Sequence, residues 1–256
     1  RIKIFTVLGN IKKTPNVNFY VDSHSDYNNK TKKKVHKLIY KYVLSIPLRL
    51  SFKYISKIFY ITSETRDFLI ELFGVKNDKL EYLPLGGIIA EDSEIEQDRK
   101  SVIQELGLNE DTIIALHSGK LKAKKRTVEM LRAFTKVNNR NLRFIIIGSI
   151  DESVSSEIEN LIKDDKRILY LGWKNNIDLR RYLCAADIYI QLGTQSATMQ
   201  NAACTGCALA LYPFKSHIKL FNNNAFYISS ENDVESLLID ITENNEILKK
   251  KKKNSF

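Results

Sequence analysis

From residue 111 onward, short continuous apolar runs alternate with segments whose apolar residues recur every three or four positions. Continuous apolar runs are typical of strands buried on both faces, and the three-to-four spacing is typical of helices that cover them. This alternation predicts a doubly wound parallel sheet in an α/β domain. Strands are expected at 112–118, 142–148, 167–172, 187–192, 207–212 and 225–229, and helices at 127–137, 153–163, 176–186, 197–204, 216–221 and 233–250.

The first part of the chain carries the same alternation less completely. Strands are expected at 1–9, 17–23, 57–62 and 79–87, and a helix at 64–73, with Ser63 as its N-cap and Gly74 as its C-cap. We therefore divide the chain into a partial N-terminal α/β domain, a linker with one short helix, a second α/β domain and a solvated basic tail. The boundaries are 1–85, 86–110, 111–248 and 249–256.

The chain has no leading signal segment and no apolar stretch long enough to span a bilayer, which favours a cytoplasmic protein. Because it begins with Arg1 and not Met, we allow for residues that precede it. The formal charge of +10 indicates anionic partners, although abundant Lys and Asn could also reflect a compositional bias. A nucleic-acid-binding protein is the weaker interpretation, since the sequence has no helix-turn-helix, zinc or aromatic RNA-binding motif.

The three cysteines form no disulfide framework. Cys204 and Cys207 have the C-x-x-C spacing, but they fall at the end of a predicted helix, where the helix dipole disfavours a thiolate. A zinc site would need two further ligands, and the sequence has none at a suitable spacing. We expect reduced, buried thiols.

Loops at the carboxyl ends of parallel strands form the usual ligand site of such sheets. One of them places Lys120 and Lys125 after the turn residue Gly119, and two ammonium groups at one strand end suit a diphosphate. A solvated basic loop is the alternative. The stretch "GTQSAT" (193–198) joins a strand to a helix start, where free backbone N–H groups favour phosphate.

These segments together resemble a known family. Gly119, Lys120, Leu121 and Lys125 fit the G-[R/K]-L-x-x-x-K motif of the retaining GT-B glycosyltransferases of "group 1", the glycogen-synthase-like class that builds bacterial surface polysaccharides. "NLRFIIIG", "ILYLGW", "LRRYLCAADIYI" and "AACTGCALALY" follow in the family's order, and "YITSETRDFLIELFGVKNDKLEYLPLGG" is similar to the end of its first domain. The resemblance covers residues 15 to 245, thinly before 58, and implies a GT-B-like fold with a Rossmann-type donor domain.

The resemblance also implies the site residues. His24, Lys120 and Lys125 are the expected catalytic residues, His24 by analogy with a histidine that touches sugar or acceptor in relatives. The family usually has two glutamates eight positions apart, but this chain has Leu192 at the first position and Gln200 at the second. An amide can still hydrogen-bond ribose hydroxyls, whereas no carboxylate is available at the first position to contact the donor sugar. The expected donor-binding residues are Ser118, Gly119, Gly172, Trp173, Gly193, Thr194, Gln195, Ser196, Gln200 and Asn201.

The implied reaction is transfer of a sugar, with retention, from a nucleotide-diphosphate sugar to a polysaccharide or lipid-linked acceptor. The leaving diphosphate would be stabilised by preorganised cations and backbone dipoles. We expect no cofactor besides the donor substrate, and no metal, since no Asp-x-Asp motif lies at a strand end. A non-catalytic or epimerase-type GT-B protein is the alternative.

Residues 27–63 contain nine Lys or Arg and no Asp or Glu, with aromatic residues between them. Basic residues with apolar neighbours suit the surface of an anionic bilayer, which predicts a peripheral location at the inner face of the cell membrane. Alternatively, the apolar residues of this segment pack under the sheet of the first domain.

Overall fold

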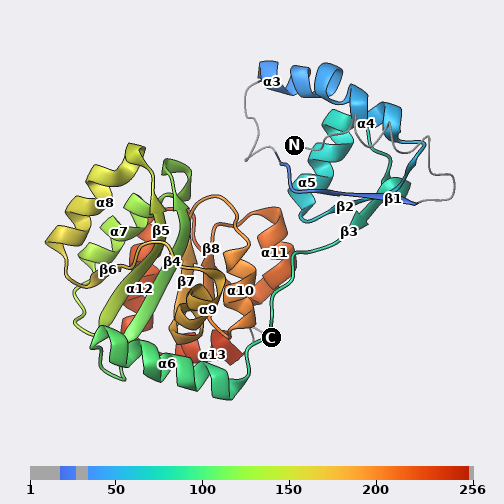
Figure 1. Ribbon diagram of the computed structural model, residues 1–256. Coiled ribbons are helices and arrows are strands. Elements are labelled where there is room, and N and C mark those ends of the chain that lie inside the picture. The colour runs from blue at the N-terminus through green and yellow to red at the C-terminus, as the bar shows by residue number, and fades with distance from the viewer. Residues whose placement is uncertain (1–17, 27–33, 254–256) are drawn as a thin grey trace. The chain divides into compact units, whose positions relative to one another are not determined.

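The computed structural model describes residues 18–26 and 34–253. The chain divides into two compact units, Arg1–Leu85 and Gly86–Phe256 (Figure 1). The strand predicted at 1–9 lies outside the described residues. Among the described residues, no helix combines the length and the apolar content that a bilayer-crossing segment requires.

The first unit contains a parallel sheet of three strands in the order β1-β2-β3. Its core consists of buried aliphatic side chains, among them Leu48, Ile55, Ile58, Leu69 and Val75. The strands are β1 (Phe19–Ser23), β2 (Ile55–Tyr60) and β3 (Leu80–Tyr82), and the helical segments are α3 (Lys34–Ile39), η1 (Tyr40–Leu44), α4 (Ile46–Ser51), α5 (Ser63–Phe68), η2 (Leu69–Phe73) and η3 (Asn77–Lys79).

The helix predicted at 64–73 is present as α5 continued by η2. Its N-cap is Thr62 and not Ser63, because Thr62 has an extended backbone and its hydroxyl accepts a hydrogen bond from the Thr65 N–H at 3.1 Å. Gly74 ends the segment with a left-handed φ of +70°, as predicted. A glycine adopts that conformation at little cost.

The second unit has a six-stranded sheet in the order β6-β5-β4-β7-β8-β9, with every strand pair parallel. The strand order reverses between β4 and β7, so their carboxyl ends form the topological switch point. This confirms the predicted doubly wound α/β fold. The strands are β4 (Ile113–Leu121), β5 (Leu142–Ile150), β6 (Ile168–Tyr170), β7 (Ile188–Gln191), β8 (Ala208–Leu211) and β9 (Ala225–Tyr227).

Helices cover both faces of this sheet, each over its own buried cluster. Residues of α7, α8 and α12 share one cluster with one face of the sheet, and residues of α6, α9 and α10 share the other. The helical segments of this unit are α6 (Asp92–Leu106), η4 (Ala123–Lys125), α7 (Thr127–Lys136), α8 (Glu152–Asp164), α9 (Asn176–Ala185), α10 (Thr198–Cys204), α11 (Lys215–Phe221), η5 (Asn222–Asn224), α12 (Glu231–Glu243) and α13 (Glu246–Lys253).

Two segments differ from their predicted roles. The helix expected inside a linker is the 15-residue α6, which buries Val102 completely and belongs to the second unit. The tail expected from residue 249 is helical as far as Lys253, because α13 buries Leu248 and places the Lys252 ammonium 2.8 Å from Asp187. Asp187 also accepts hydrogen bonds from Arg99 of α6 and from a β4 N–H.

Candidate functional site

The two loops that leave the switch point are in direct contact. The loop after β4 runs through η4, and the loop after β7 leads from Leu192 to α10. The Thr194 N–H of the second loop donates to the Lys124 carbonyl of the first at 3.1 Å. Ligands of doubly wound sheets bind outside the carboxyl ends of the strands at such a point, so these loops form the candidate site.

Lys125 joins the two loops. Its ammonium donates to the carbonyl oxygens of Thr194 at 2.9 Å and Gln195 at 3.4 Å. The side chain is only 9% exposed, and no ion pair joins it to a carboxylate within residues 18–26 and 34–253. Burial lowers the pKa of Lys125 to about 8. A buried cation held only by carbonyl dipoles is stabilised when an anion binds beside it.

Gly193 permits this close contact. A Cβ at this position would lie 2.3 Å from the Lys124 carbonyl oxygen and 2.5 Å from the Lys125 carbonyl carbon. Both obstacles are backbone atoms, which cannot move aside as a flexible side chain would. Any other residue at 193 would push the two loops apart.

In the turn that was predicted to bind phosphate (193–196), two side chains already form hydrogen bonds within the protein. The Ser196 hydroxyl donates to Gln191 Oε1 at 2.6 Å, and the Gln195 amide donates to the Ser216 hydroxyl at 2.5 Å. The helix that follows, α10, begins at Thr198 and has seven residues. For the Ser196 hydroxyl or the Gln195 amide to reach a ligand, each must leave its present partner.

A buried polar cluster lies below this turn, and the sequence analysis missed it. His117 of β4 and Tyr189 and Gln191 of β7 are all fully buried. The Tyr189 hydroxyl lies 3.4 Å from Gln191 Oε1, whereas Gln191 Nε2 is buried without a hydrogen-bond partner in the described structure. The sequence indicates this cluster only through His117, Tyr189 and Gln191, which are polar residues within the otherwise apolar runs "TIIALHS" and "DIYIQL".

His117 is held neutral within this cluster. Burial and then the nearby Lys125 ammonium lower the pKa of His117 to about 3. Its Nδ1 lies 2.8 Å from the Ile190 carbonyl, which can only accept, so the proton is on Nδ1. Nε2 is then an acceptor, and it is buried without a partner among the described residues. The cluster therefore offers hydrogen-bonding capacity without negative charge.

The two amides predicted at the ribose differ in their surroundings. Gln200 is buried in α10, and its Oε1 has no hydrogen-bond partner among the described residues, whereas Asn201 is exposed. Leu192, at the position of the family's first glutamate, is completely buried in the sheet core. Of the family's two glutamate positions, the first therefore holds the apolar side chain of Leu192. The second holds the Gln200 amide, whose oxygen has no hydrogen-bond partner among the described residues.

Further predicted residues lie around the same strand ends. Ser118 is buried in β4, and Lys120 is exposed at the end of that strand. The Gly172 carbonyl accepts a hydrogen bond from the Gly148 N–H at 2.8 Å, and Trp173 follows with 67% of its surface exposed. Trp173 follows β6, which is two strands from β4 and so roughly 10 Å from the switch point.

His24 lies in the first unit, just after β1. Its Nε2 is 2.8 Å from the Asp22 carboxylate, and both side chains are largely exposed. The predicted catalytic residues are thus divided between the two units, with both lysines in the second.

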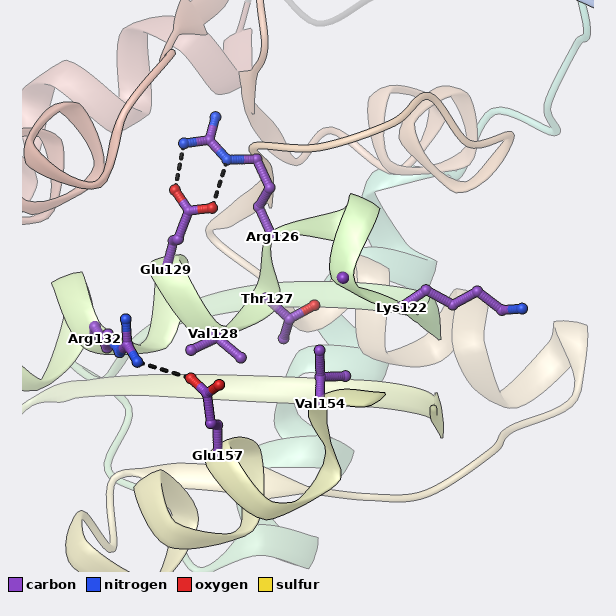
Figure 2. Close-up of a pocket in the computed structure, with 9 residues that line it drawn as sticks. Lys122, Arg126, Thr127, Val128, Glu129, Arg132, Val154 and Glu157 are labelled. Carbon is purple, nitrogen blue, oxygen red and sulfur yellow. Dashed lines mark hydrogen bonds and ion pairs between the residues drawn. The ribbon is translucent and has the colours of Figure 1, made fainter. Parts of the chain in front are cut away.

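A cavity of about 210 Å³ lies between the N-terminal ends of α7 and α8 (Figure 2). Arg126 pairs there with Glu129, and Arg132 with Glu157. None of the predicted site residues lines this cavity. Because these guanidinium groups already bind carboxylates, the cavity lacks the unpaired cation that distinguishes the switch point.

No disulfide joins the three cysteines, as predicted. Cys184 and Cys207 are buried, and Cys204 is partly exposed. Burial raises the pKa of both Cys184 and Cys207 to about 12, which keeps these thiols protonated near neutral pH.

Comparison with solved structures gives relatives of the same fold. HepE from Anabaena, solved with UDP and glucose, is 12% identical with a TM-score of 0.72, over 93% of this chain and 65% of that one. WaaG, described as a glycosyltransferase of lipopolysaccharide biosynthesis, is 14% identical with a TM-score of 0.66, over 97% and 75% of the two chains. Sucrose-phosphate synthase from Thermosynechococcus elongatus is 14% identical with a TM-score of 0.71, over 98% and 65%.

This chain thus spans about two thirds of the length of these structures. The GT-B-like α/β fold class predicted from the sequence is confirmed. Comparison with curated protein sequences finds no match. The family model described as "Glycosyl transferases group 1" matches residues 98–252, more than half of the chain. The chain therefore belongs to the group 1 glycosyl transferases.

Proposed function

We propose that this chain binds a nucleotide-diphosphate sugar at its switch point and transfers the sugar, with retention, to a polysaccharide or lipid-linked acceptor. Family membership supports transfer of a glycosyl group. The relatives support the donor and acceptor classes, since HepE was solved with UDP-glucose and WaaG is described as acting in lipopolysaccharide biosynthesis.

The observation that carries the proposal is the buried Lys125 ammonium, which contacts the carbonyls of Thr194 and Gln195 and no carboxylate among the described residues. When the bond between the anomeric carbon and the diphosphate breaks, negative charge grows on the leaving phosphate. A cation already fixed beside that phosphate, in a site that excludes water, stabilises this charge without reorganising. Lys120, exposed at the end of β4, supplies a second cation to the same strand end.

The nucleoside would extend from the switch point across the end of β5 toward β6. Trp173, largely exposed after β6, offers an aromatic face on which a nucleobase can stack. The separation of roughly 10 Å between β4 and β6 suits the distance from a diphosphate to its base. This arrangement leaves the ribose and the sugar close to the switch point, beside α10 and the buried polar cluster.

The missing glutamates favour a specific alternative, a protein that binds a nucleotide sugar without transferring it. Leu192 cannot contact a sugar hydroxyl, and the Gln200 amide can bind ribose hydroxyls but carries no charge. We propose that the Gln200 Oε1 acceptor holds the ribose. Binding would then survive the loss of both carboxylates, and turnover decides between the two functions.

Titration calorimetry with UDP, GDP and ADP, and then with the sugar nucleotides of the base that binds, tests the donor site. We expect one nucleoside diphosphate to bind, and Lys125→Met to weaken it at least tenfold, since a charge-assisted hydrogen bond contributes about 1.5–3 kcal/mol. Lys124→Met is the matched control, because Lys124 is an exposed lysine of the same loop. Equal affinity of wild type and Lys125→Met would contradict the proposal.

Turnover is measured as release of the free nucleoside diphosphate from its sugar nucleotide, with and without lipid-linked oligosaccharide. Proton NMR of the product reports whether the anomeric configuration is retained. Activity that persists in EDTA would agree with the predicted independence of metal. Tight binding with no release of nucleoside diphosphate in the presence of acceptor would identify the non-catalytic alternative.

A further inference from the structure

The helical segment formed by α3, η1 and α4 exposes an unusual number of large apolar side chains. Eight of them lie within 16 consecutive positions, and each is at least 43% exposed. They are Val35, Leu38, Ile39, Tyr42, Val43, Leu44, Ile46 and Leu50. We call the residues 35, 38, 39, 42, 43, 46 and 50 the apolar stripe, because they are exposed and recur every three to four positions along these consecutive helical segments.

The opposite side of this segment is anchored to the first unit. Tyr40 packs edge-on against Phe68 and Phe73, with ring centroids 5.6 and 6.2 Å apart. Arg49 Nε donates to the Phe73 carbonyl at 3.0 Å, and Leu48 is buried in the core of the unit. The inner side of this segment therefore packs against the rest of the first unit, while the apolar stripe remains exposed. The alternative, in which the apolar residues of this segment all pack under the sheet, does not hold, because the residues of the stripe are exposed.

The charged side chains of this helical segment itself have one sign. Lys41 and Lys53 are exposed, and so is Arg49 beyond its contact with Phe73. No Asp or Glu occurs between residues 27 and 63. An ordinary solvated helix face mixes both signs, as α6 does with the exposed Glu96 and Lys100.

We propose that the apolar stripe lies on the surface of an anionic lipid bilayer, with its apolar side chains at the level of the acyl boundary and the adjacent lysines at the phosphate headgroups. A helix with one apolar face and a basic polar face lies in the plane of the interface in this way. The inference does not rest on transfer activity, and it would bring the proposed enzyme to a lipid-linked acceptor.

A second copy of the chain and a nucleic acid fit these features less well. A second copy of the same face would bring like charges together, which disfavours association. A nucleic acid would use the lysines but would leave the apolar stripe in water. An anionic bilayer satisfies both the apolar and the cationic side chains of the segment.

Co-sedimentation with vesicles tests the proposal. We expect binding to vesicles of phosphatidylcholine with 30% phosphatidylglycerol, in low salt, and little binding to phosphatidylcholine alone. Lys41→Glu with Lys53→Glu should reduce the partition coefficient at least 25-fold, since each basic residue near an anionic surface contributes about fivefold. Leu38→Asn with Leu50→Asn should reduce it by a similar or larger factor, because burial of each leucine contributes about tenfold.

Matched variants in the second unit separate a local contact from a general charge effect. Lys163→Glu with Lys166→Glu makes the same change of net charge at exposed positions, and Ile177→Asn removes an exposed apolar side chain. These variants should bind vesicles as the wild type does. Circular dichroism melting should show that all variants remain folded, since every substituted side chain is exposed.

Three results would overturn the proposal. The first is equal binding of the wild type to both kinds of vesicle, or to neither. The second is equal loss of binding in the variants of the second unit. The third is a dimer, measured by sedimentation equilibrium, that Leu38→Asn with Leu50→Asn dissociates while vesicle binding is absent, which would assign the stripe to a second copy.

Discussion

Replacing Lys125 by methionine removes a buried charge while keeping most of the side-chain volume. Burial lowers the pKa of Lys125 from its ordinary value of 10.5 to about 8. Between these two values the unfolded chain still holds a proton that the folded protein has lost. The free energy of unfolding therefore rises with pH in this window, and the full cost of the buried charge is present below pH 8.

The size of this effect follows from the shift. At 1.36 kcal/mol for each pKa unit, the wild type should gain about 2–3 kcal/mol relative to Lys125→Met between pH 7 and pH 10. Because Lys125 is 9% exposed, solvent screens little of this energy. The comparison with Lys125→Met cancels the titration of every other group in this range.

Urea unfolding followed by circular dichroism at pH 7, 8, 9 and 10 measures the difference. Lys124→Met, at an exposed position, should show a constant difference from the wild type. A bound nucleoside diphosphate should flatten the wild-type rise, because its negative charge raises the pKa of Lys125. If wild type and Lys125→Met differ by the same amount at pH 7 and pH 10, Lys125 is not a buried cation and the electrostatic argument fails.

Other changes test the rest of the site. Lys120→Ala should weaken binding of a nucleoside diphosphate about tenfold in titration calorimetry with little change in melting temperature, since one exposed charge-assisted contact is lost. Gly193→Ala should cost at least about 2 kcal/mol in urea unfolding, because its Cβ would overlap the Lys124 carbonyl, and an unchanged midpoint would contradict the loop contact. Gln191→Leu should lower the free energy of unfolding by about 1–3 kcal/mol, because the buried Tyr189 hydroxyl and the Ser196 hydroxyl lose their Oε1 acceptor, and should weaken sugar-nucleotide binding more than binding of the nucleoside diphosphate. His24→Ala should lower kcat in the transfer assay and leave nucleotide affinity unchanged, since His24 lies in the first unit.

The sheet of the second unit could be predicted because its signal is local. Each of its six strands carries an apolar run, and the four central strands are largely buried on both faces, which leaves little room for another interpretation. The ends of elements were less accurate. Thr62 and Ser63 are both good N-cap residues, and only the backbone conformation of Thr62 selects it.

Features that depend on contacts between distant residues were missed. The sequence predicts that the lysine run after residue 248 is solvated. In the structure, however, Lys252 pairs with Asp187, which lies 65 positions earlier in the chain. The proximity of Lys125 to Thr194 could be expected only from the strand order, which places β4 beside β7. The buried cluster of His117, Tyr189 and Gln191 needs the same order, since its members come from both strands.

The Asp187 carboxylate draws together both ends of the second unit. It accepts from Arg99 of the first helix of this unit at 3.1 Å and from Lys252 of the last at 2.8 Å. A unit whose first and last helices meet tolerates circular permutation, with the old ends joined by a short linker. New ends opened between α7 and β5 would lie at the amino end of β5, away from the carboxyl ends of the strands that form the switch point. The second unit, where we propose that the donor binds, could then be grafted into a host protein as a one-piece sensor for sugar nucleotides.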